Sequence, residues 1–454
     1  MKLESINPAT GEVIAEYPEM EEGQLRSLLA QSHEAFYAWR ETGFADRARI
    51  LRQAASILRS KANDHATTMA REMGKPVRQG RAEAEKCAWA CEYYADNAGD
   101  FLRSEIIKTE ASRSYVTFEP LGPILAIMPW NYPFWQLFRF AAPALMSGNA
   151  VVLKHASNVP GCALAIEQLL LDAGLPEGVF RSLLIGSDRV ASVIESSFVK
   201  GITLTGSADA GMAVAAKAGQ ALKKTVLELG GSDPYIILEG ADLGAAVDAC
   251  VTGKLLNCGQ TCIAPKRFIV VESVREPFEA LMIERMSAAQ TGDPLLEETE
   301  LGPMARHDLR EELHRQVVQS IDGGANRLLG GEVPEGPGAY YPPTVLTGVT
   351  KGMPAYDEEV FGPVAAIVPV RDEEEAVRVA NDSVYGLGAA VFTGDIERGE
   401  RVVQRLEAGC CAINDFVRSD PRLPFGGIKG SGYGRELSHY GIKEFMNIKT
   451  VVVK

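Results

Sequence analysis

Residues 124–154, ILAIMPWNYPFWQLFRFAAPALMSGNAVVLK, decide the fold class. A continuous apolar run, ILAIMPW, leads into a helical stretch and then into a second apolar run, AVVLK. Apolar strands that alternate with helices are typical of a parallel sheet covered by helices on both faces. The stretch therefore predicts a strand–helix–strand unit of an α/β domain.

The same alternation continues toward the C-terminus. Further apolar runs bounded by Gly or Pro are ITLTG, TVLELGG, PYIIL, RFIVV, VAAIVPV, AAVFT and CAIND. At roughly 150 residues per domain, the chain of 454 residues has room for about three units. Because the runs are too many for one half-sheet, we expect two doubly wound α/β domains.

The first 120 residues have a different pattern. INPATGEVIAEYP predicts a strand hairpin, and the following stretches carry apolar residues at the three- and four-residue spacing of amphipathic helices. Two strand-like segments, IIKTEASRSYVTFE and the C-terminal FMNIKTVVVK, lie outside this scheme. They predict pairing at a sheet edge, either within the chain or between two copies of it.

Composition excludes several classes of function. Lys and Arg number 46 against 60 Asp and Glu, which gives a net charge of −14 with the basic residues scattered. Binding to nucleic acid needs a concentrated positive surface, so it is not expected. No apolar run approaches the ~18 residues of a membrane span, and the N-terminus lacks the apolar core of a signal peptide. We expect a cytoplasmic protein that binds no membrane.

Eight cysteines are too few for a disulfide framework in this chain. None forms a C-x-x-C pair or has a His at zinc-finger spacing, and the six His residues are dispersed. We therefore expect no metal site and regard most of the thiols as small buried apolar groups.

Two side chains suit covalent and acid–base chemistry. Cys262, in NCGQTCIAPKR, follows a glycine turn that can present a thiol to a cleft; the alternative is a buried structural cysteine. Glu228 ends an apolar strand directly before two glycines. Surroundings that raise its pKa would make it a general base, whereas a partly exposed strand-end carboxylate is the alternative.

Two further segments suit the binding of negative charge. Asn131 is enclosed by Pro129 and Pro133, so its amide is held stiffly enough to donate to an oxyanion; alternatively it only shapes a turn. Gly206 and Ser207 open a helix directly after a strand, where backbone N–H groups suit a phosphate. That segment is neither G-x-G-x-x-G nor a P-loop.

The ordered series PWN, LTGS, LELGG, GQTC and EEVFGP resembles the NAD(P)-dependent aldehyde dehydrogenase superfamily over essentially the whole chain. Details such as MPWNYPFWQ and LGPMAR are most similar to the bacterial succinate-semialdehyde dehydrogenases of the Sad/YneI type. The resemblance implies a cofactor-binding domain (1–106 and 121–230), a catalytic domain (231–428) and a β oligomerisation arm (107–120 and 429–454). A homodimer or homotetramer is expected.

The resemblance also implies the reaction. Cys262 would attack the aldehyde to form a thiohemiacetal, whose alkoxide accepts hydrogen bonds from the Asn131 amide and the Cys262 backbone N–H. Hydride transfer to the nicotinamide would leave a thioester, and Glu228 would activate the water that hydrolyses it. The most similar relatives indicate succinate semialdehyde as the aldehyde and succinate as the product.

Residues of the cofactor cleft follow from the same resemblance: Trp130, Lys154, Ser157, Gly206, Ser207, Glu359 and Phe361. Lys154 would reach the adenine ribose, and Glu359 would hold the nicotinamide ribose. Members that prefer NAD often carry Glu at the position of Ser157. Its absence removes repulsion toward a 2′-phosphate and Lys154 adds attraction, so we expect both NAD and NADP to be used.

Substrate residues are implied at three positions. Arg139 lies where several semialdehyde dehydrogenases place an Arg that pairs with the substrate carboxylate, a role suited to its planar fork; the alternative is an ion pair on a helix surface. A second Arg expected at position 256 is replaced by Leu256. Arg418 is the candidate to replace it, and the adjacent Ser419 is a further candidate for substrate binding.

Some alternatives remain. Cys258 is a candidate for a reversible disulfide with Cys262 under oxidation, or else a packed core thiol. A dehydrogenase of another small aliphatic or aromatic aldehyde is the first rival function. A cysteine thioester hydrolase would need Cys262 and Glu228 but not Lys154, and a non-catalytic binding protein would need none of them.

Overall fold

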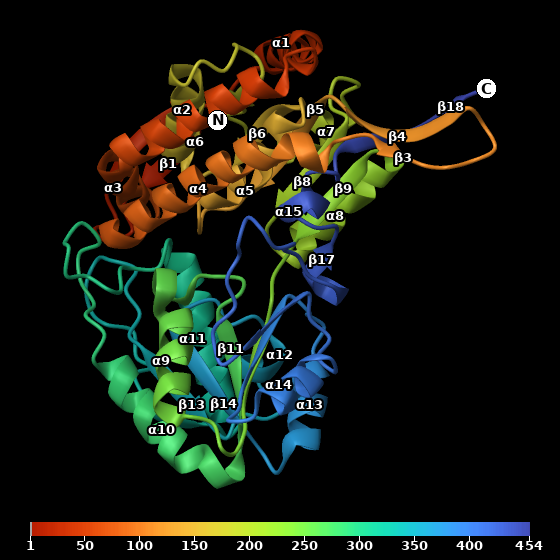
Figure 1. Cartoon of the computed structure of the whole chain (residues 1–454). Coiled ribbons are helices and arrows are strands. Elements are labelled where there is room, and N and C mark those ends of the chain that lie inside the picture. The colour runs from red at the N-terminus through yellow and green to blue at the C-terminus, as the bar shows by residue number, and fades with distance from the viewer. Residues whose placement is uncertain (1) are drawn as a thin grey trace.

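The computed structural model describes residues 2–454. The chain starts with an antiparallel hairpin. Four helices follow, and they lie over the six-stranded sheet described below (Figure 1). These elements are β1 (Lys2–Ile6), β2 (Val13–Pro18), α1 (Glu22–Arg40), α2 (Phe44–Ser60), α3 (Ala62–Met73) and α4 (Val77–Phe101). The predicted hairpin and helical region are therefore present.

A six-stranded sheet follows, with the order β17-β9-β8-β5-β6-β7. All its strands are parallel except β17, which pairs antiparallel with β9. Its strands are β5 (Pro123–Met128), β6 (Ala150–His155), β7 (Phe180–Ser182), β8 (Gly201–Thr205), β9 (Lys224–Glu228) and β17 (Gly432–Tyr433). The connecting helices are α5 (Trp135–Met146), α6 (Pro160–Asp172), η1 (Ser187–Arg189), α7 (Val190–Glu195) and α8 (Ala208–Gln220). Every residue of β6 and β8 is buried, as continuous apolar runs require.

A seven-stranded sheet forms the lower half of Figure 1, with the order β12-β13-β14-β11-β10-β15-β16. Only β12 is antiparallel to its neighbour. The strands are β10 (Asp233–Ile237), β11 (Pro265–Val271), β12 (Asn326–Leu329), β13 (Thr344–Thr347), β14 (Val364–Val370), β15 (Gly388–Phe392) and β16 (Cys410–Ile413). The helices are α9 (Leu243–Leu255), η2 (Leu256–Gly259), α10 (Glu272–Ser287), α11 (His307–Asp322), α12 (Pro354–Asp357), α13 (Glu373–Asn381) and α14 (Ile396–Val403). The predicted class, two α/β domains, is confirmed.

A three-stranded sheet projects from the body beside the C-terminus (Figure 1). It has the order β18-β4-β3, from β18 (Met446–Val453), β4 (Arg113–Pro120) and β3 (Glu105–Ile106). The antiparallel register runs from Met446 opposite Pro120 to Val453 opposite Arg113. This long two-strand ladder carries no core of its own.

The boundaries of this arm differ from those expected. Residues 429–445, expected in the arm, contain η3 (Lys429–Ser431), β17 and α15 (Ser438–Gly441), and β17 joins the six-stranded sheet. Gly432 explains the difference, because it has a φ of +105° and a Cβ there would lie 2.1 Å from the Leu227 carbonyl oxygen. Only glycine lets the chain approach β9 this closely.

Candidate active site

One edge of the six-stranded sheet gathers side chains that are far apart in sequence. The parallel strands β9, β8, β5 and β6 are neighbours, and they lead directly into Glu228, Ser207, Asn131 and Lys154 at their carboxyl ends. Ligands of open α/β sheets bind outside these strand ends. The topology therefore brings four of the predicted site residues to one edge.

Cys262 lies opposite this edge in a loop between η2 and β11, and the loop has an unusual backbone. Asn257 and Cys258 have φ values of +54° and +56°, and Gly259 has +72°. Side-chain-bearing residues adopt this left-handed region only when their surroundings hold them there. At Gly259 a Cβ would lie 2.1 Å from the Gly362 carbonyl oxygen, so the position requires glycine.

Asn131 is hydrogen-bonded to the loop that carries Cys262. Its Nδ2 donates to the Gln260 carbonyl oxygen at 3.0 Å. Asn257 Nδ2 in turn donates to the carbonyl oxygens of Asn131, at 2.8 Å, and of Gln260, at 3.1 Å. One of the two Nδ2 hydrogens of Asn131 is thus used within the protein, and the other is left to donate to a reacting oxygen.

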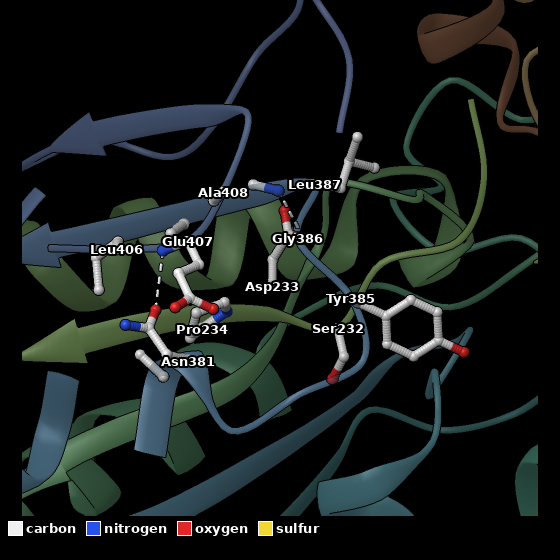
Figure 2. Close-up of a pocket in the computed structure, with 13 residues that line it drawn as sticks. Ser232, Asp233, Pro234, Asn381, Tyr385, Gly386, Leu387, Leu406, Glu407 and Ala408 are labelled. Carbon is white, nitrogen blue, oxygen red and sulfur yellow. Dashed lines mark hydrogen bonds between the residues drawn. The ribbon is translucent and has the colours of Figure 1, made fainter. Parts of the chain in front are cut away.

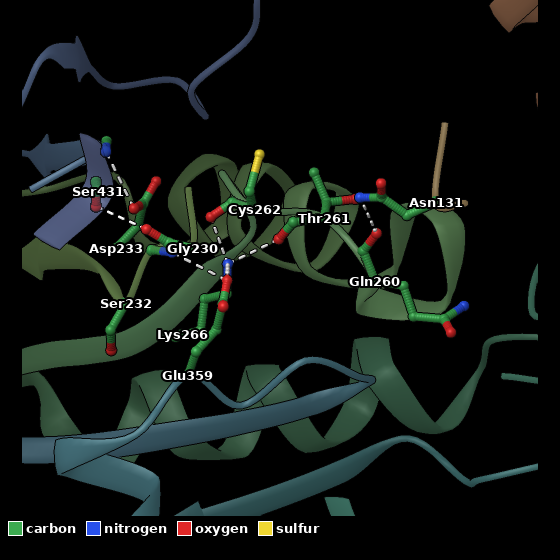
Figure 3. A network of polar contacts seen from close by, with 12 residues as sticks. Asn131, Gly230, Ser232, Asp233, Gln260, Thr261, Cys262, Lys266, Glu359 and Ser431 are labelled. Carbon is green, nitrogen blue, oxygen red and sulfur yellow. Dashed lines mark hydrogen bonds and ion pairs between the residues drawn. The ribbon is translucent and has the colours of Figure 1, made fainter. Parts of the chain in front are cut away.

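Lys266, a residue that the sequence reasoning missed, supports the same loop from below. Its side chain is fully buried, and its Nζ donates to the carbonyl oxygens of Thr261, at 2.7 Å, and Cys262, at 2.5 Å. Glu359 lies 3.6 Å from Lys266 Nζ and accepts from the Gly231 backbone N–H at 3.0 Å. In Figure 3 the Cys262 sulfur points away from Lys266. The sequence did contain a signal for Lys266, namely a lysine at the start of an apolar strand. A charge that is buried there needs polar partners.

Burial controls the protonation of Cys262 and Glu228. It raises the pKa of the Cys262 thiol to about 12, against the opposing charges of Lys266 and Arg139. Glu228 is 2% exposed and neither of its carboxylate oxygens has a hydrogen-bond partner within residues 2–454. Burial raises the pKa of Glu228 well above its usual value, and Arg139 opposes that shift. A carboxyl group in this environment is a strong base once it has ionised.

Arg139, expected to face the substrate or a helix surface, has a different partner. Its side chain is 2% exposed and forms an ion pair with the buried Glu436, while Nη2 donates to Thr205 Oγ1 at 3.3 Å. The alternative prediction, an ion pair of Arg139 on a helix surface, is therefore wrong, because both charged groups are buried. Sequence reasoning did not identify Glu436, which lies in the segment GYGRELSH without a local pattern that indicates its partner.

A cavity of about 1070 Å³ opens beside Cys262 and is lined by α4, α5, α9 and the loop after β16. Its volume suits a small organic molecule. A second pocket, lined by Asp233, Tyr385 and Glu407 (Figure 2), holds only about 10 Å³. That is the space of a single water, so this pocket has no room for an organic ligand.

The other two predicted substrate residues both line the large cavity. Arg418 is exposed and pairs with Asp415 at 2.7 Å. Ser419 is buried, and its Oγ accepts from Lys86 Nζ at 2.8 Å and from Trp135 Nε1 at 3.1 Å. Ser419 is therefore held in place by two donors, whereas Arg418 already has a carboxylate partner.

The predicted cofactor residues fit a dinucleotide. Lys154 is 8% exposed, and no residue of the described chain accepts a hydrogen bond from its ammonium group. Ser207 is the N-cap of α8, where its Oγ accepts from the Ala210 N–H at 3.3 Å. A buried cation without a partner and an exposed helix N-terminus both suit phosphate or ribose oxygens.

The remaining predicted cofactor residues are Trp130, Phe361, Ser157 and Gly206. The rings of Trp130 and Phe361 meet edge to face at 5.9 Å between centroids. Ser157 is exposed two residues after β6, and Gly206 precedes the N-cap of α8 with its N–H donating to the Glu228 carbonyl oxygen at 3.0 Å. An aromatic surface of this kind suits a planar ring, and the exposed Ser157 is open to a ligand, whereas the Gly206 N–H is already used within the protein.

Cys258 is buried and belongs to the hydrophobic core of the seven-stranded sheet, whereas Cys262 packs at the edge of the core around α4 and α5.

Within residues 2–454, no three His, Cys, Asp or Glu side chains gather in a way that could hold a metal ion. No helix in that range is long and apolar enough to span a membrane.

Comparison with known proteins agrees with this geometry. The profile of the Aldehyde dehydrogenase family matches residues 1–451. The chain is 48% identical over 447 residues to succinate semialdehyde dehydrogenase Sad of Escherichia coli, covering 98% of this chain and 97% of that one. It is 47% identical over 451 residues to a probable NADP(+) succinate-semialdehyde dehydrogenase of Synechocystis sp., covering 99% of both. The succinic semialdehyde dehydrogenase of Streptococcus pyogenes, solved with NADP+, has a TM-score of 0.97 at 39% identity and 99% coverage of both chains. The chain thus belongs to the aldehyde dehydrogenase family.

Proposed function

We propose that this protein oxidises succinate semialdehyde to succinate, with NADP or NAD as the hydride acceptor. The observation that carries the proposal is the hydrogen bond between Asn131 and the loop of Cys262, because it ties an oxyanion donor to a nucleophile at the wall of a cavity. Relatives named for this reaction align with nearly the full chain. Other small aldehydes remain the first alternative substrates.

In the first step the Cys262 thiol gives up its proton to solvent water, and Sγ forms a bond to the aldehyde carbon as the carbonyl π bond breaks. The carbonyl oxygen gains negative charge and accepts from the free Nδ2 hydrogen of Asn131 and from the Cys262 backbone N–H. Each such fixed donor is typically worth about 10²–10³ in rate, since it acts where charge develops. A neutral thiol with a raised pKa reacts slowly, so the loss of its proton belongs to this step.

A bound dinucleotide would accept the hydride that leaves the thiohemiacetal carbon, which converts the thiohemiacetal into a thioester. Glu359 and Phe361 would hold its nicotinamide end, and Lys154 and Ser207 would bind its ribose and phosphates. Ser157 places no carboxylate near Lys154, which favours acceptance of a 2′-phosphate alongside a free 2′-hydroxyl. These residues also count against a thioester hydrolase, which has no use for them.

In the second half of the reaction Glu228 takes a proton from the water that attacks the thioester carbonyl. The carbon–sulfur bond breaks, the Cys262 thiolate leaves and is reprotonated, and the carboxylic acid is released. Glu228 performs this step only when ionised, so the nearby Arg139 charge, which opposes the rise of its pKa, increases the active fraction.

The domain roles and the assembly belong to the same proposal. The six-stranded sheet would bind the cofactor, the seven-stranded sheet would carry Cys262, and the arm would pair with a second copy in a homodimer or homotetramer. β18 is an edge strand with Val452 63% exposed, so its free ladder suits pairing with another chain. All eight cysteines are free, which fits a reducing compartment such as the cytoplasm.

The test compares initial rates of NADP and NAD reduction with succinate semialdehyde and with butanal, which has the same chain length but no carboxylate. We expect a higher kcat/KM for succinate semialdehyde and loss of activity with both aldehydes in Cys262→Ala. Equal kcat/KM values for the two aldehydes would refute the assigned substrate, and an active Cys262→Ala variant would refute the mechanism.

A further inference from the structure

The cavity beside Cys262 is lined by five cationic side chains, and four of them already have carboxylate partners. These four pairs are Arg78 with Glu300, Arg139 with Glu436, Arg285 with Asp248, and Arg418 with Asp415. The fifth cation is Lys86. Within the described chain, no carboxylate lies within 4.0 Å of its Nζ, so its charge lacks an ion-pair partner.

Lys86 reaches the cavity from α4. It shares one helical face with Gln79, Ala82 and Glu83, which also line the cavity. Its Nζ lies 4.4 Å from the centroid of the Trp135 ring and donates to Ser419 Oγ at 2.8 Å. The aromatic face and the hydroxyl hold the ammonium group in one position without neutralising it.

Lys86 and Ser419 have hydrogen-bond donors without acceptors at the cavity wall. Ser419 Oγ accepts from both Lys86 Nζ and Trp135 Nε1, so its own O–H is free to donate. Lys86 carries three N–H groups and uses one on Ser419. Two N–H groups of Lys86 and the O–H of Ser419 therefore have no acceptor among the described residues, and both side chains line the cavity. A carboxylate bound there would supply acceptor oxygens for them.

We propose that Lys86, together with Ser419, binds the terminal carboxylate of the substrate and selects an ω-carboxylated aldehyde over an uncharged one. The inference rests on the proposed function and deepens it. Arg139 also lines the cavity, but its charge is paired with Glu436, which leaves Lys86 as the cavity cation without a carboxylate partner. Partial burial lowers the pKa of Lys86 to about 8, and a bound carboxylate would favour its charged form.

The test replaces Lys86 with Met, which keeps the length of the side chain and removes the charge, and with Arg, which keeps the charge. With succinate semialdehyde, Lys86→Met should raise KM about 10- to 100-fold, the factor contributed by hydrogen bonds to charged groups, with a much smaller change in kcat. With butanal, kcat/KM should stay within about twofold, which also shows that the variant is folded. Lys86→Arg should retain most of the preference for succinate semialdehyde.

A binding measurement gives an independent readout. Succinate should inhibit butanal oxidation in the unmodified protein and do so about 10- to 100-fold more weakly in Lys86→Met. Arg78→Met is the matched control, because Arg78 lines the same cavity from the same helix but is paired with Glu300. It should leave both KM for succinate semialdehyde and succinate inhibition within about twofold.

Two results would overturn the inference while leaving the proposed function intact. In the first, Lys86→Met keeps KM for succinate semialdehyde unchanged. In the second, Lys86→Met lowers kcat/KM equally for succinate semialdehyde and butanal, which indicates a structural role of Lys86. An unmodified protein that does not prefer succinate semialdehyde over butanal would overturn the inference and the assigned substrate together.

Discussion

Replacement of Asn131 by alanine separates the catalytic from the structural role of this side chain. The amide makes one hydrogen bond within the protein, from Nδ2 to the Gln260 carbonyl oxygen at 3.0 Å, and has one hydrogen left for the oxyanion. Removing that donor should lower kcat/KM by about 10²–10³, or about 2.7–4 kcal/mol of transition-state stabilisation.

The structural cost should be much smaller. After the substitution the Gln260 carbonyl oxygen still accepts from Asn257 Nδ2 at 3.1 Å, so no buried acceptor is left without a partner. The lost hydrogen bond should then lower the free energy of unfolding by only about 1 kcal/mol. The same protein preparation therefore should show a large loss of rate and a small shift of the unfolding midpoint.

The assay pairs steady-state kinetics with thermal unfolding for Asn131→Ala and Asn131→Asp. The aspartate has the same shape but only acceptor oxygens when ionised, so it should be at least as slow as the alanine variant. A kcat/KM within about fivefold of the unmodified value in Asn131→Ala would refute the oxyanion role. A loss of rate matched by global unfolding would show that Asn131 acts through stability instead.

Three further variants test the other parts of the site. Glu228→Gln should slow steady-state turnover about 10²–10⁴-fold, because hydrolysis of the thioester loses its base. A burst of one reduced dinucleotide per active site should remain, since formation of the thioester does not need Glu228. Rapid-mixing absorbance measures this burst, and its absence would place Glu228 in the formation of the thioester. Ser157→Glu should lower kcat/KM for NADP about 10- to 100-fold relative to NAD, since a carboxylate repels the 2′-phosphate, and an unchanged ratio would contradict the role of position 157. Gly259→Ala should lower the unfolding midpoint. A φ of +72° costs the folded state about 1–3 kcal/mol when the residue carries a side chain, and the new Cβ would lie 2.1 Å from the Gly362 carbonyl oxygen. Unchanged stability would mean that the loop relaxes freely.

The assembly has its own perturbation. Val452→Lys places a charge on the exposed edge of β18 and should shift the oligomer toward the monomer in light scattering, because strand pairing would bury that charge. An unchanged mass would argue that the arm does not form the contact between copies.

Local sequence pattern was enough to predict the fold class and one edge of the site. Runs such as AVVLK have no polar alternation, so only a sheet covered on both faces can bury them. Once strands are parallel neighbours, their carboxyl ends meet at one edge, and Glu228 and Asn131 follow from their positions at those ends. Lys154 lies at the same edge but was identified through the family resemblance.

Contacts between distant segments could not be predicted in this way. The pairing of Arg139 with Glu436, the support of the Cys262 loop by Lys266, and the solitary charge of Lys86 each depend on which side chains the folded chain places within a few ångströms. A local pattern indicates how far a residue is buried, but not which distant group neutralises it. The partner of a buried charge is decided by packing, because burial is costly until that partner is in place.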